Sequence, residues 1–106
     1  MTASPAPLRI ALGEDHQDLA QVLAMLIDMQ PDLHCIGHAA TAGGVLELAE
    51  REAPDAYVLD LTLADGSCIP LVARLRARQP DCLVVVFTGY ADPALEAACR
   101  TAGCDA

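Results

Sequence analysis

Short apolar runs alternate with longer amphipathic segments along this chain, and successive runs begin about 25 residues apart. The runs lack the polar alternation of a half-exposed strand, which favours strands that are buried on both faces. The segments between them place apolar residues at the spacing of one helical face. The pattern predicts strands over Leu8–Gly13, Leu33–Ala40, Ala56–Asp60 and Cys82–Thr88, with helices over about 17–29, 41–53, 68–78 and 92–102.

Prolines and capping residues mark where these predicted helices begin and end. A proline follows each of the first three helices, and the residue before a proline avoids helical backbone angles. Thr41 and Asp92 are residue types that cap helix N-termini, and Gly103 is a common C-terminal stop. The apolar faces are expected to comprise Leu19, Val22, Leu23, Leu26 and Ile27 in the first helix, and Val45, Leu46, Ala49 and Ala53 in the second.

Strands and helices that alternate in this way predict βαβ units, and hence one α/β domain built on a parallel sheet. The dipeptide Pro-Asp introduces three of the strands, at Pro31, Pro54 and Pro80, and Asp105 stands where that acid would recur. A fifth strand is therefore expected to begin where the chain ends. We expect a flexible tail over residues 1–7 and a C-terminally incomplete domain over 8–106. The missing strand and helix would lie outside this sequence or come from another chain, and without them apolar surface would be exposed beside the fourth strand.

The amino-acid composition argues against several classes of protein and of binding site. The net charge of −9 makes this segment a poor ligand for nucleic-acid phosphates, and all six basic residues are arginines. Five cysteines without a C-x-x-C pair argue against a disulfide framework and a zinc knuckle, and favour reduced thiols. No apolar run is long enough to span a membrane, and a signal-peptide pattern is absent from the N-terminus. The simplest location is the cytoplasm.

Acidic residues follow two of the predicted strands. Glu14 and Asp15 come directly after the first strand, Asp60 ends the third, and Thr88 ends the fourth. If the first and third strands are neighbours, three carboxylates meet at one edge of the sheet. Two unit charges about 5 Å apart repel by about 3 kcal/mol at an effective dielectric constant of 20. Either one acid stays protonated or a cation binds, and Mg²⁺ is the cation that these oxygen ligands suit.

A carboxylate beside Mg²⁺ is a competent nucleophile toward a phosphoryl group. Asp60 needs no base to activate it, because a carboxyl group with an ordinary pKa of about 3.9 is ionised at neutral pH. Catalysis then consists mostly of positioning and of charge neutralisation. The Thr88 hydroxyl could bind a phosphate oxygen, and Gly89 would leave the approach open.

Four features together resemble the receiver domain of bacterial two-component response regulators. They are the acidic pair at Glu14 and Asp15, Asp60 itself, the segment D-L-T-L-A-D-G that begins with it, and F-T-G after the fourth strand. The resemblance covers residues 8–106. It implies a flavodoxin-like, doubly wound parallel sheet with strand order 2-1-3-4-(5).

The resemblance also implies roles for individual residues. Asp60 would accept phosphate from a sensor histidine kinase. Asp15, Asp60 and the backbone carbonyl of Thr62 would bind Mg²⁺, with Glu14 holding a metal-bound water. Thr88 would be the switch hydroxyl that moves toward the phosphate. The domain would act as a conformational switch rather than an enzyme, at most catalysing its own phosphorylation and dephosphorylation, and a homodimer is one state that the resemblance allows.

The output is expected to be transcriptional regulation through a DNA-binding domain elsewhere in the parent protein, because D-L-T-L-A-D-G resembles receivers joined to helix-turn-helix domains. Two departures from the family are the alanine at position 64, where proline is common, and the absence of the lysine and switch aromatic of the fifth strand. If the domain naturally ends here, the missing lysine would suit an unphosphorylated pseudo-receiver that serves only for protein contacts. A Mg²⁺-dependent phosphohydrolase using an aspartyl phosphate is a further alternative, although such enzymes place D-x-D on the first strand.

Simpler interpretations exist for the same residues. Glu14 and Asp15 could be ordinary acids that favour the N-terminus of a helix. Thr88 could be a β-branched strand residue, and Tyr90 is expected to lie near the pocket as a surface or gating side chain. His16, His34 and His38 are interpreted as structural or surface residues, because no pair of them has metal-ligand spacing supported by other ligands.

Overall fold

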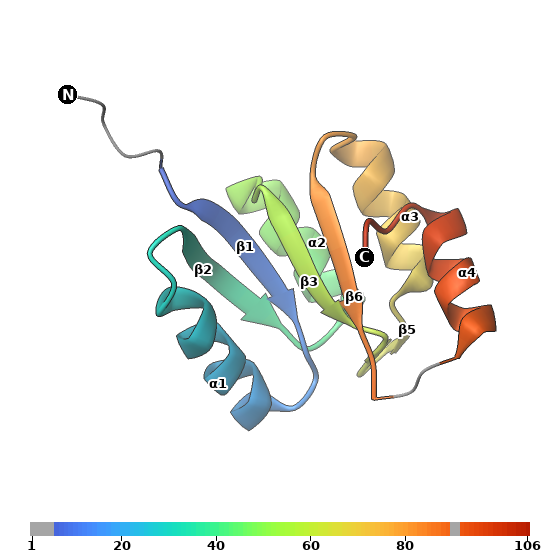
Figure 1. The fold of residues 1–106 in the computed structure, drawn as a ribbon, viewed down its shortest axis with the longest axis horizontal. Coiled ribbons are helices and arrows are strands. Elements are labelled where there is room, and N and C mark those ends of the chain that lie inside the picture. Colours follow the sequence, from blue (N-terminus) through green and yellow to red (C-terminus); the bar gives the residue numbers. More distant parts are fainter. Residues whose placement is uncertain (1–5, 90–91) are drawn as a thin grey trace.

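A computed structural model describes residues 6–89 and 92–106 of the chain. Its main sheet has four parallel strands in the order β2-β1-β3-β6, as Figure 1 shows. The strands are β1 (Leu8–Gly13), β2 (Leu33–Ala39), β3 (Ala56–Asp60) and β6 (Leu83–Phe87). The doubly wound parallel sheet expected from the sequence is therefore confirmed, and the predicted strand ranges are correct to within one residue at each end.

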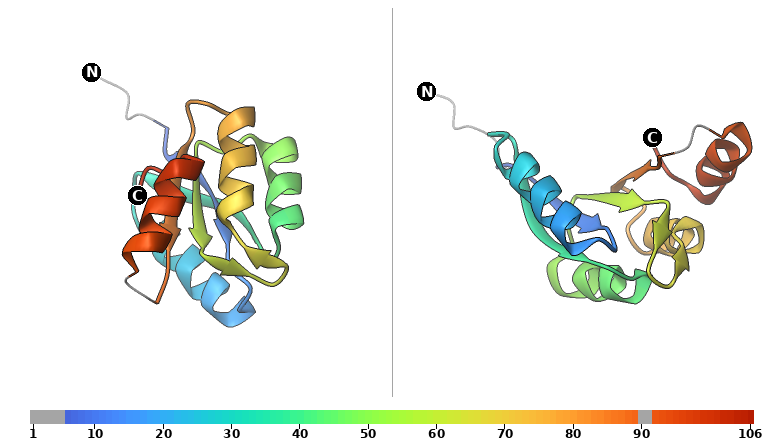
Figure 2. Two further views of the ribbon diagram at one scale, coloured as in Figure 1. Left: turned by 90° about the vertical axis from the view of Figure 1, so that its right-hand side faces the viewer. Right: turned by 90° about the horizontal axis from the view of Figure 1, so that it is seen from below.

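Four helices cover this sheet: α1 (Gln17–Asp28), α2 (Ala42–Glu52), α3 (Ile69–Arg78) and α4 (Pro93–Ala102). Figure 2 shows α1 on one face and α2 and α3 on the other, while α4 packs against α3 beyond β6. None of the helices in the described part of the chain has the length and apolar character needed to cross a membrane.

The residues predicted to cap the helices lie at the helix ends. The Thr41 hydroxyl accepts a hydrogen bond from the Gly44 amide at 3.0 Å, and the Asp92 carboxylate accepts one from the Ala94 amide at 2.9 Å. Gly103 ends α4 with a φ of 115°, a left-handed conformation that costs glycine little. Both predicted N-caps and the glycine stop are confirmed.

A small hairpin was not predicted. The residues after Asp60 form β4 (Thr62–Leu63) and β5 (Gly66–Ser67), which pair antiparallel. The sequence predicted only a turn closed by Asp65 and Gly66, because two-residue strands leave no periodic signal. The hairpin buries Leu63 against the main core.

The largest core lies between the sheet and helices α2 and α3. Tyr57 and Leu59 of β3 are fully buried there. The inner face of α3 is formed by Leu71, Val72 and Leu75, as predicted. On α2 the prediction was partly wrong. Val45 and Ala49 are buried as expected, but Leu48 joins them in the core and Leu46 is only half-buried. Ala53 is exposed, because it is the C-cap that follows the last residue of α2.

The opposite face of the sheet is covered incompletely. The predicted apolar face of α1 includes Leu19, Val22 and Leu26, yet these side chains are 43%, 51% and 52% exposed. Leu23 and Ile27 are half-buried, and Ala20 is the buried residue of the helix. The expectation that this face is all core was wrong, because α1 covers only β1 and β2 and leaves β3 and β6 bare on this side.

The outer edge of β6 carries the last residues of the chain. The Asp105 amide donates a hydrogen bond to the Val84 carbonyl at 2.7 Å, and the Val86 amide donates one to the Ala106 carbonyl at 2.9 Å. This alternation matches the start of a parallel ladder. Leu83 of β6 is 48% exposed, so the apolar surface expected beside the fourth strand is present. That a complete fifth strand and a further helix follow stays a prediction.

Two neighbouring glycines at the start of α2 should respond oppositely to alanine. A Cβ at Gly44 would lie 2.8 Å from the Cβ of Ala39, whereas at Gly43 the nearest atom is 4.0 Å away. We expect Gly43→Ala to raise the free energy of unfolding by about 0.5–1 kcal/mol, since alanine favours helix. Gly44→Ala should lower it by about 1–3 kcal/mol through overpacking. Urea denaturation measures both, and equal effects of the two substitutions would contradict this packing.

Candidate functional site

The C-terminal ends of three adjacent strands meet at one edge of the sheet. Gly13, the last residue of β1, pairs with Leu59, so Glu14 and Asp60 follow on neighbouring strands. Asp60 in turn pairs with Phe87 of β6, which places Thr88 one residue beyond. The predicted neighbourhood of the first and third strands is confirmed, and it brings the expected residues to the same edge.

Glu14 is a buried acid with an exposed fraction of only 1%. Its backbone amide donates to the Ala39 carbonyl of β2 at 3.0 Å, which holds the residue in line with the sheet. The Oε1 atom accepts a hydrogen bond from the His16 amide at 3.2 Å and lies 3.0 Å from the His16 Nδ1 atom. The Oε2 atom is buried with no hydrogen-bond partner in the described part of the chain. A buried acceptor without a donor is costly, so this oxygen favours a cation or a proton nearby.

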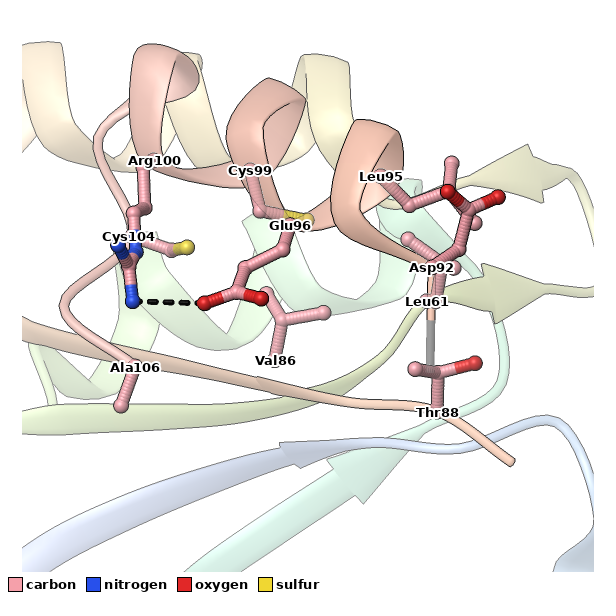
Figure 3. A pocket seen from close by; sticks show the side chains of 10 residues that line it. All are labelled: Leu61, Val86, Thr88, Asp92, Leu95, Glu96, Cys99, Arg100, Cys104 and Ala106. Atoms are coloured by element: carbon pink, nitrogen blue, oxygen red, sulfur yellow. Dashed lines mark ion pairs between the residues drawn. The ribbon is translucent and has the colours of Figure 1, made fainter. Parts of the chain in front are cut away.

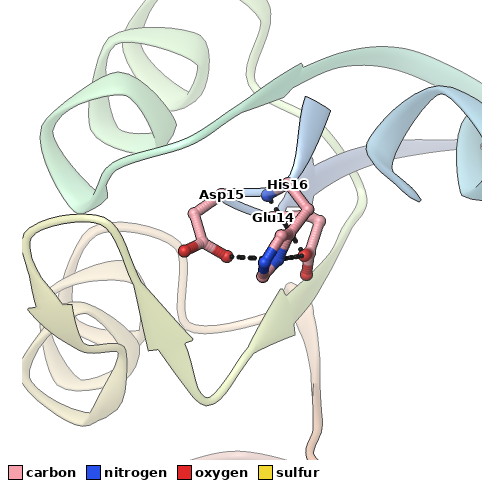
Figure 4. A group of neighbouring side chains, drawn as sticks. All are labelled: Glu14, Asp15 and His16. Atoms are coloured by element: carbon pink, nitrogen blue, oxygen red, sulfur yellow. Dashed lines mark hydrogen bonds and ion pairs between the residues drawn. The ribbon is translucent and has the colours of Figure 1, made fainter. Parts of the chain in front are cut away.

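Asp15 and His16 complete a cluster around Glu14, which Figure 4 shows. The Asp15 Oδ1 atom lies 3.1 Å from His16 Nδ1, although it has no hydrogen bond of acceptable geometry. One ligand atom from each of Glu14, Asp15 and His16 lies within 4.8 Å of the other two. These three residues form what we call the acidic cluster.

His16 was interpreted from the sequence as a structural or surface residue, and its exposure agrees with a position at the surface. Its side chain is 75% exposed, but the ring nitrogen faces both acids. His16 is also the N-cap of α1, yet its side chain makes no capping hydrogen bond. Serine, threonine, aspartate and asparagine are the usual residues there. The sequence signal for this arrangement was a histidine directly after two acids, at a helix N-cap position that histidine seldom occupies.

Asp60 contacts the acidic cluster through Glu14. Burial raises the pKa of Asp60 to about 6, and a hydrogen bond shared with Glu14 adds to the shift, while the Thr62 amide acts in the opposite direction. Burial also acts to raise the pKa of Glu14, but the hydrogen bonds from Asp60 and His16 outweigh it, so the pKa of Glu14 is lowered. The two carboxyl groups therefore compete for one proton. This is the electrostatic conflict that the sequence predicted for converging acids.

Thr62 and Thr88 flank Asp60 from two sides. The Thr62 amide donates to Asp60 Oδ1 at 3.3 Å, so this peptide is adjacent to the carboxylate. Thr88 lines a cavity of roughly 250 Å³ between the end of β6 and α4, shown in Figure 3 together with Leu61 and Leu95. Leu61 directly follows Asp60, so the cavity adjoins the site. Tyr90 lies outside the described residues.

The donor set fits a divalent cation. The possible ligand atoms are mostly carboxylate oxygens, and one buried Glu14 oxygen has no donor among the described residues, so a cation would stabilise it. The site therefore has both the charge and the ligand chemistry for a metal ion, and it holds a carboxyl group, Asp60, beside it.

Repulsion between the crowded carboxylates should lower the stability of the metal-free protein. Because the pKa of Asp60 is raised to about 6, the folded state favours the neutral form of this carboxyl group. The free energy of unfolding therefore falls as the pH rises from about 4 to about 6, and it stays lower at higher pH. Asp60→Asn cannot ionise, and its amide can donate to Glu14. In EDTA above about pH 7, we expect Asp60→Asn to raise the free energy of unfolding by about 1–2 kcal/mol, with the difference disappearing below about pH 4.

Urea denaturation across this pH range measures the effect. Asp81→Asn is the matched control, because it removes the same charge from an exposed position at the other end of β6. An Asp60→Asn protein that follows the wild-type pH profile throughout would contradict the proposed crowding.

Comparison with known proteins gives a consistent result. The family model for the response regulator receiver domain matches residues 10–106. The nitrate/nitrite response regulator protein NarL of Escherichia coli is 33% identical over 82 residues, which cover 77% of this chain and 38% of that protein. The DNA-binding transcriptional activator DevR/DosR of Mycobacterium tuberculosis is 30% identical over 83 residues, covering 78% and 38%. The chain thus spans less than half the length of these curated relatives.

Solved structures agree with this match. A LuxR-family two-component response regulator from Aurantimonas superposes with a TM-score of 0.87 at 27% identity, covering 93% of this chain and 71% of that one. A response regulator from Burkholderia pseudomallei, solved with a phosphorylated aspartic acid, a calcium ion and citrate, gives a TM-score of 0.84 at 28% identity, covering 92% and 56%. The chain belongs to the family of response regulator receiver domains.

Proposed function

We propose that this chain is a phosphoacceptor domain in which Asp60 takes phosphate from the phosphohistidine of a sensor histidine kinase. One observation carries the proposal: the ends of β1 and β3 bring the buried Glu14, one oxygen of which has no hydrogen-bond partner among the described residues, next to the carboxyl group of Asp60. The related protein from Burkholderia pseudomallei, whose structure contains a phosphorylated aspartic acid and a calcium ion, supports the same chemistry here.

The mechanism assigns a role to each residue of the site. Asp15, Asp60 and the Thr62 carbonyl would bind Mg²⁺, and Glu14 would hold a water of its coordination shell. When bound, the ion neutralises charge on the carboxylates and on the phosphoryl oxygens. The ionised Asp60 attacks phosphorus, so that a P–O bond forms while the P–N bond to the kinase histidine breaks. The electron pair of that bond stays on the histidine nitrogen, which takes up a proton from solvent, so the histidine is released as neutral imidazole.

Thr88 is proposed as the switch hydroxyl that follows phosphorylation. It lies at the end of β6, next to the strand that carries Asp60, and it lines the cavity beneath α4. This cavity would give the Thr88 side chain room to turn toward the phosphate. Movement of α4 would then pass the signal to a partner.

The parent protein is proposed to regulate transcription from the cytoplasm. Relatives such as DevR/DosR are named as transcriptional activators, and the acidic charge of this segment leaves DNA binding to another domain. Other relatives are named protein-glutamate methylesterase/protein-glutamine glutaminase, so receivers of this kind occur with different outputs. A homodimer is proposed as the active state, as is usual for regulators that bind symmetric DNA sites.

A second candidate is an unphosphorylated pseudo-receiver that serves only in protein contacts. The lysine that the resemblance implies belongs to the fifth strand, which these 106 residues do not include, so the residues of this chain leave both candidates open. Mg²⁺ titration separates the two candidates. A phosphoacceptor should bind Mg²⁺ at millimolar concentration at Glu14, Asp15 and Asp60, and a pseudo-receiver should not.

Phosphorylation can be tested directly with acetyl phosphate and Mg²⁺. We expect intact-mass spectrometry to detect one phosphoryl group on the wild-type chain, which hydroxylamine removes because it is an acyl phosphate. Asp60→Asn should abolish this label. Asp65→Asn is the matched control, because Asp65 lies five residues away in the same segment and accepts a backbone hydrogen bond from Ala42.

The outcomes distinguish the candidates. A label that persists in Asp60→Asn refutes the assignment of the phosphoacceptor. An unlabelled wild-type chain that also fails to bind Mg²⁺ favours the pseudo-receiver. Rapid multiple-turnover hydrolysis of a phosphomonoester would indicate a phosphohydrolase instead.

A further inference from the structure

We propose that Cys99 and Cys104 form a dithiol site, which a low-molecular-weight disulfide such as glutathione disulfide converts reversibly into an internal disulfide bond at the end of α4. All five cysteines of the chain are free thiols in the structure. The inference does not rest on phosphorylation of Asp60, because both cysteines lie outside the acidic cluster. It assigns a chemical modification to the helix that borders the Thr88 cavity.

The backbone at the end of α4 holds the two cysteines close together. The Cys104 amide donates a hydrogen bond to the Cys99 carbonyl at 3.0 Å, and the Gly103 amide donates one to the Arg100 carbonyl at 3.0 Å. These two bonds define a Schellman motif. With standard bond lengths, the first of them keeps the Cα atoms of the two cysteines within about 7 Å of each other. Disulfides join Cα atoms about 4.4–6.8 Å apart, so the bridge needs little or no movement of the backbone.

The two side chains also face the same space. Both line the cavity of roughly 250 Å³ beneath α4, as Figure 3 shows. Side chains at these two positions of a Schellman motif frequently contact each other. Burial raises the pKa of the Cys104 thiol, and the neighbouring Cys99 thiol raises it further. The two sulfur atoms are therefore neighbours, and the cavity leaves room for the side-chain rotations that a bond between them requires.

The difference in exposure sets the order of the reaction. Cys104 is half-buried, whereas Cys99 is only 6% exposed. The Cys104 thiolate therefore attacks glutathione disulfide first, whose S–S bond breaks, so that Cys104 becomes a mixed disulfide and one glutathione thiolate leaves. The Cys99 thiolate then attacks the Cys104 sulfur, and the second glutathione thiolate leaves. In total the two cysteine thiols lose two electrons and two protons, and the oxidant becomes two molecules of glutathione.

The raised pKa of Cys104 makes the first step slow at neutral pH. The thiolate is the nucleophile, and burial keeps most of this thiol protonated. We expect the rate of oxidation to rise by about tenfold between pH 7 and pH 8, because the thiolate fraction rises by that factor below the pKa.

The remaining cysteines supply a competitor and a control. Cys68 is fully buried, and burial raises its pKa to about 12, so it is a poor nucleophile although it lies near the pair. Cys35 is half-buried like Cys104, but it belongs to β2, at the opposite edge of the sheet from β6. Its thiol donates to the Gly37 carbonyl at 3.5 Å. Cys35→Ser is therefore the matched control.

The test treats the folded chain with excess glutathione disulfide at about pH 8, quenches with acid and alkylates the free thiols with N-ethylmaleimide. We expect the monomer to lose about 2 Da before alkylation, which dithiothreitol reverses, and three of the five cysteines to accept the alkylating reagent. Trypsin cuts after Arg100, between the two cysteines. Residues 101–106 should then be joined to residues 79–100, and fragmentation should place the bond on Cys99 rather than on Cys82.

The variants separate the two thiols. Cys99→Ser should retain glutathione on Cys104 as an unresolved mixed disulfide, Cys104→Ser should form no bridge, and Cys35→Ser should form it as the wild type does.

Three results with the wild-type chain would overturn the inference. They are alkylation of all five cysteines after oxidation, glutathione that stays on Cys104, and residues 101–106 joined to residues 52–74, which contain Cys68. None of these results bears on labelling by acetyl phosphate. Failure of that labelling would in turn leave the Cys99–Cys104 bridge standing and overturn only the proposed function.

Discussion

The structure depends on one unfavourable arrangement, the burial of the Glu14 carboxylate next to Asp60. Parallel pairing of β1 with β3 forces the two acids together, because both strands end at the same edge of the sheet. Burial raises the pKa of Asp60, and the contact with Glu14 raises it further. The fold thus keeps an acidic pocket whose negative charge a cation or a proton would neutralise.

The acidic pocket lies between the packed core on one side and a cavity on the other. On one side, Tyr57 and Leu59 anchor β3 in the core beneath α2 and α3, so Asp60 lies at the end of a strand whose core-facing side is fully buried. On the other side, Thr88 borders a cavity under α4. A carboxylate fixed by the core beside a hydroxyl that borders open space is a suitable arrangement for a switch, because a change at the first can move the second.

The incomplete covering of the sheet is the other physical feature of the chain. The bare side of β3 and β6, the exposed leucines of α1 and the ladder begun by Asp105 and Ala106 lie on or next to the same strands. Apolar surface of this kind is normally covered in a parallel α/β sheet.

The sequence by itself determined the order of strands and helices, their caps, and the placement of Glu14, Asp15, Asp60 and Thr88 at strand ends. These follow from local periodicity and from the rule that parallel strands end at one edge. Only the tertiary structure decided the features that depend on neighbours distant in sequence or on side-chain orientation. They include the exposure of half of the apolar face of α1, the burial of Leu48, and the two-residue strands after Asp60. They also include the direction of the His16 ring, because a rotamer toward the acids rather than toward the helix N-terminus leaves no trace in the order of residues.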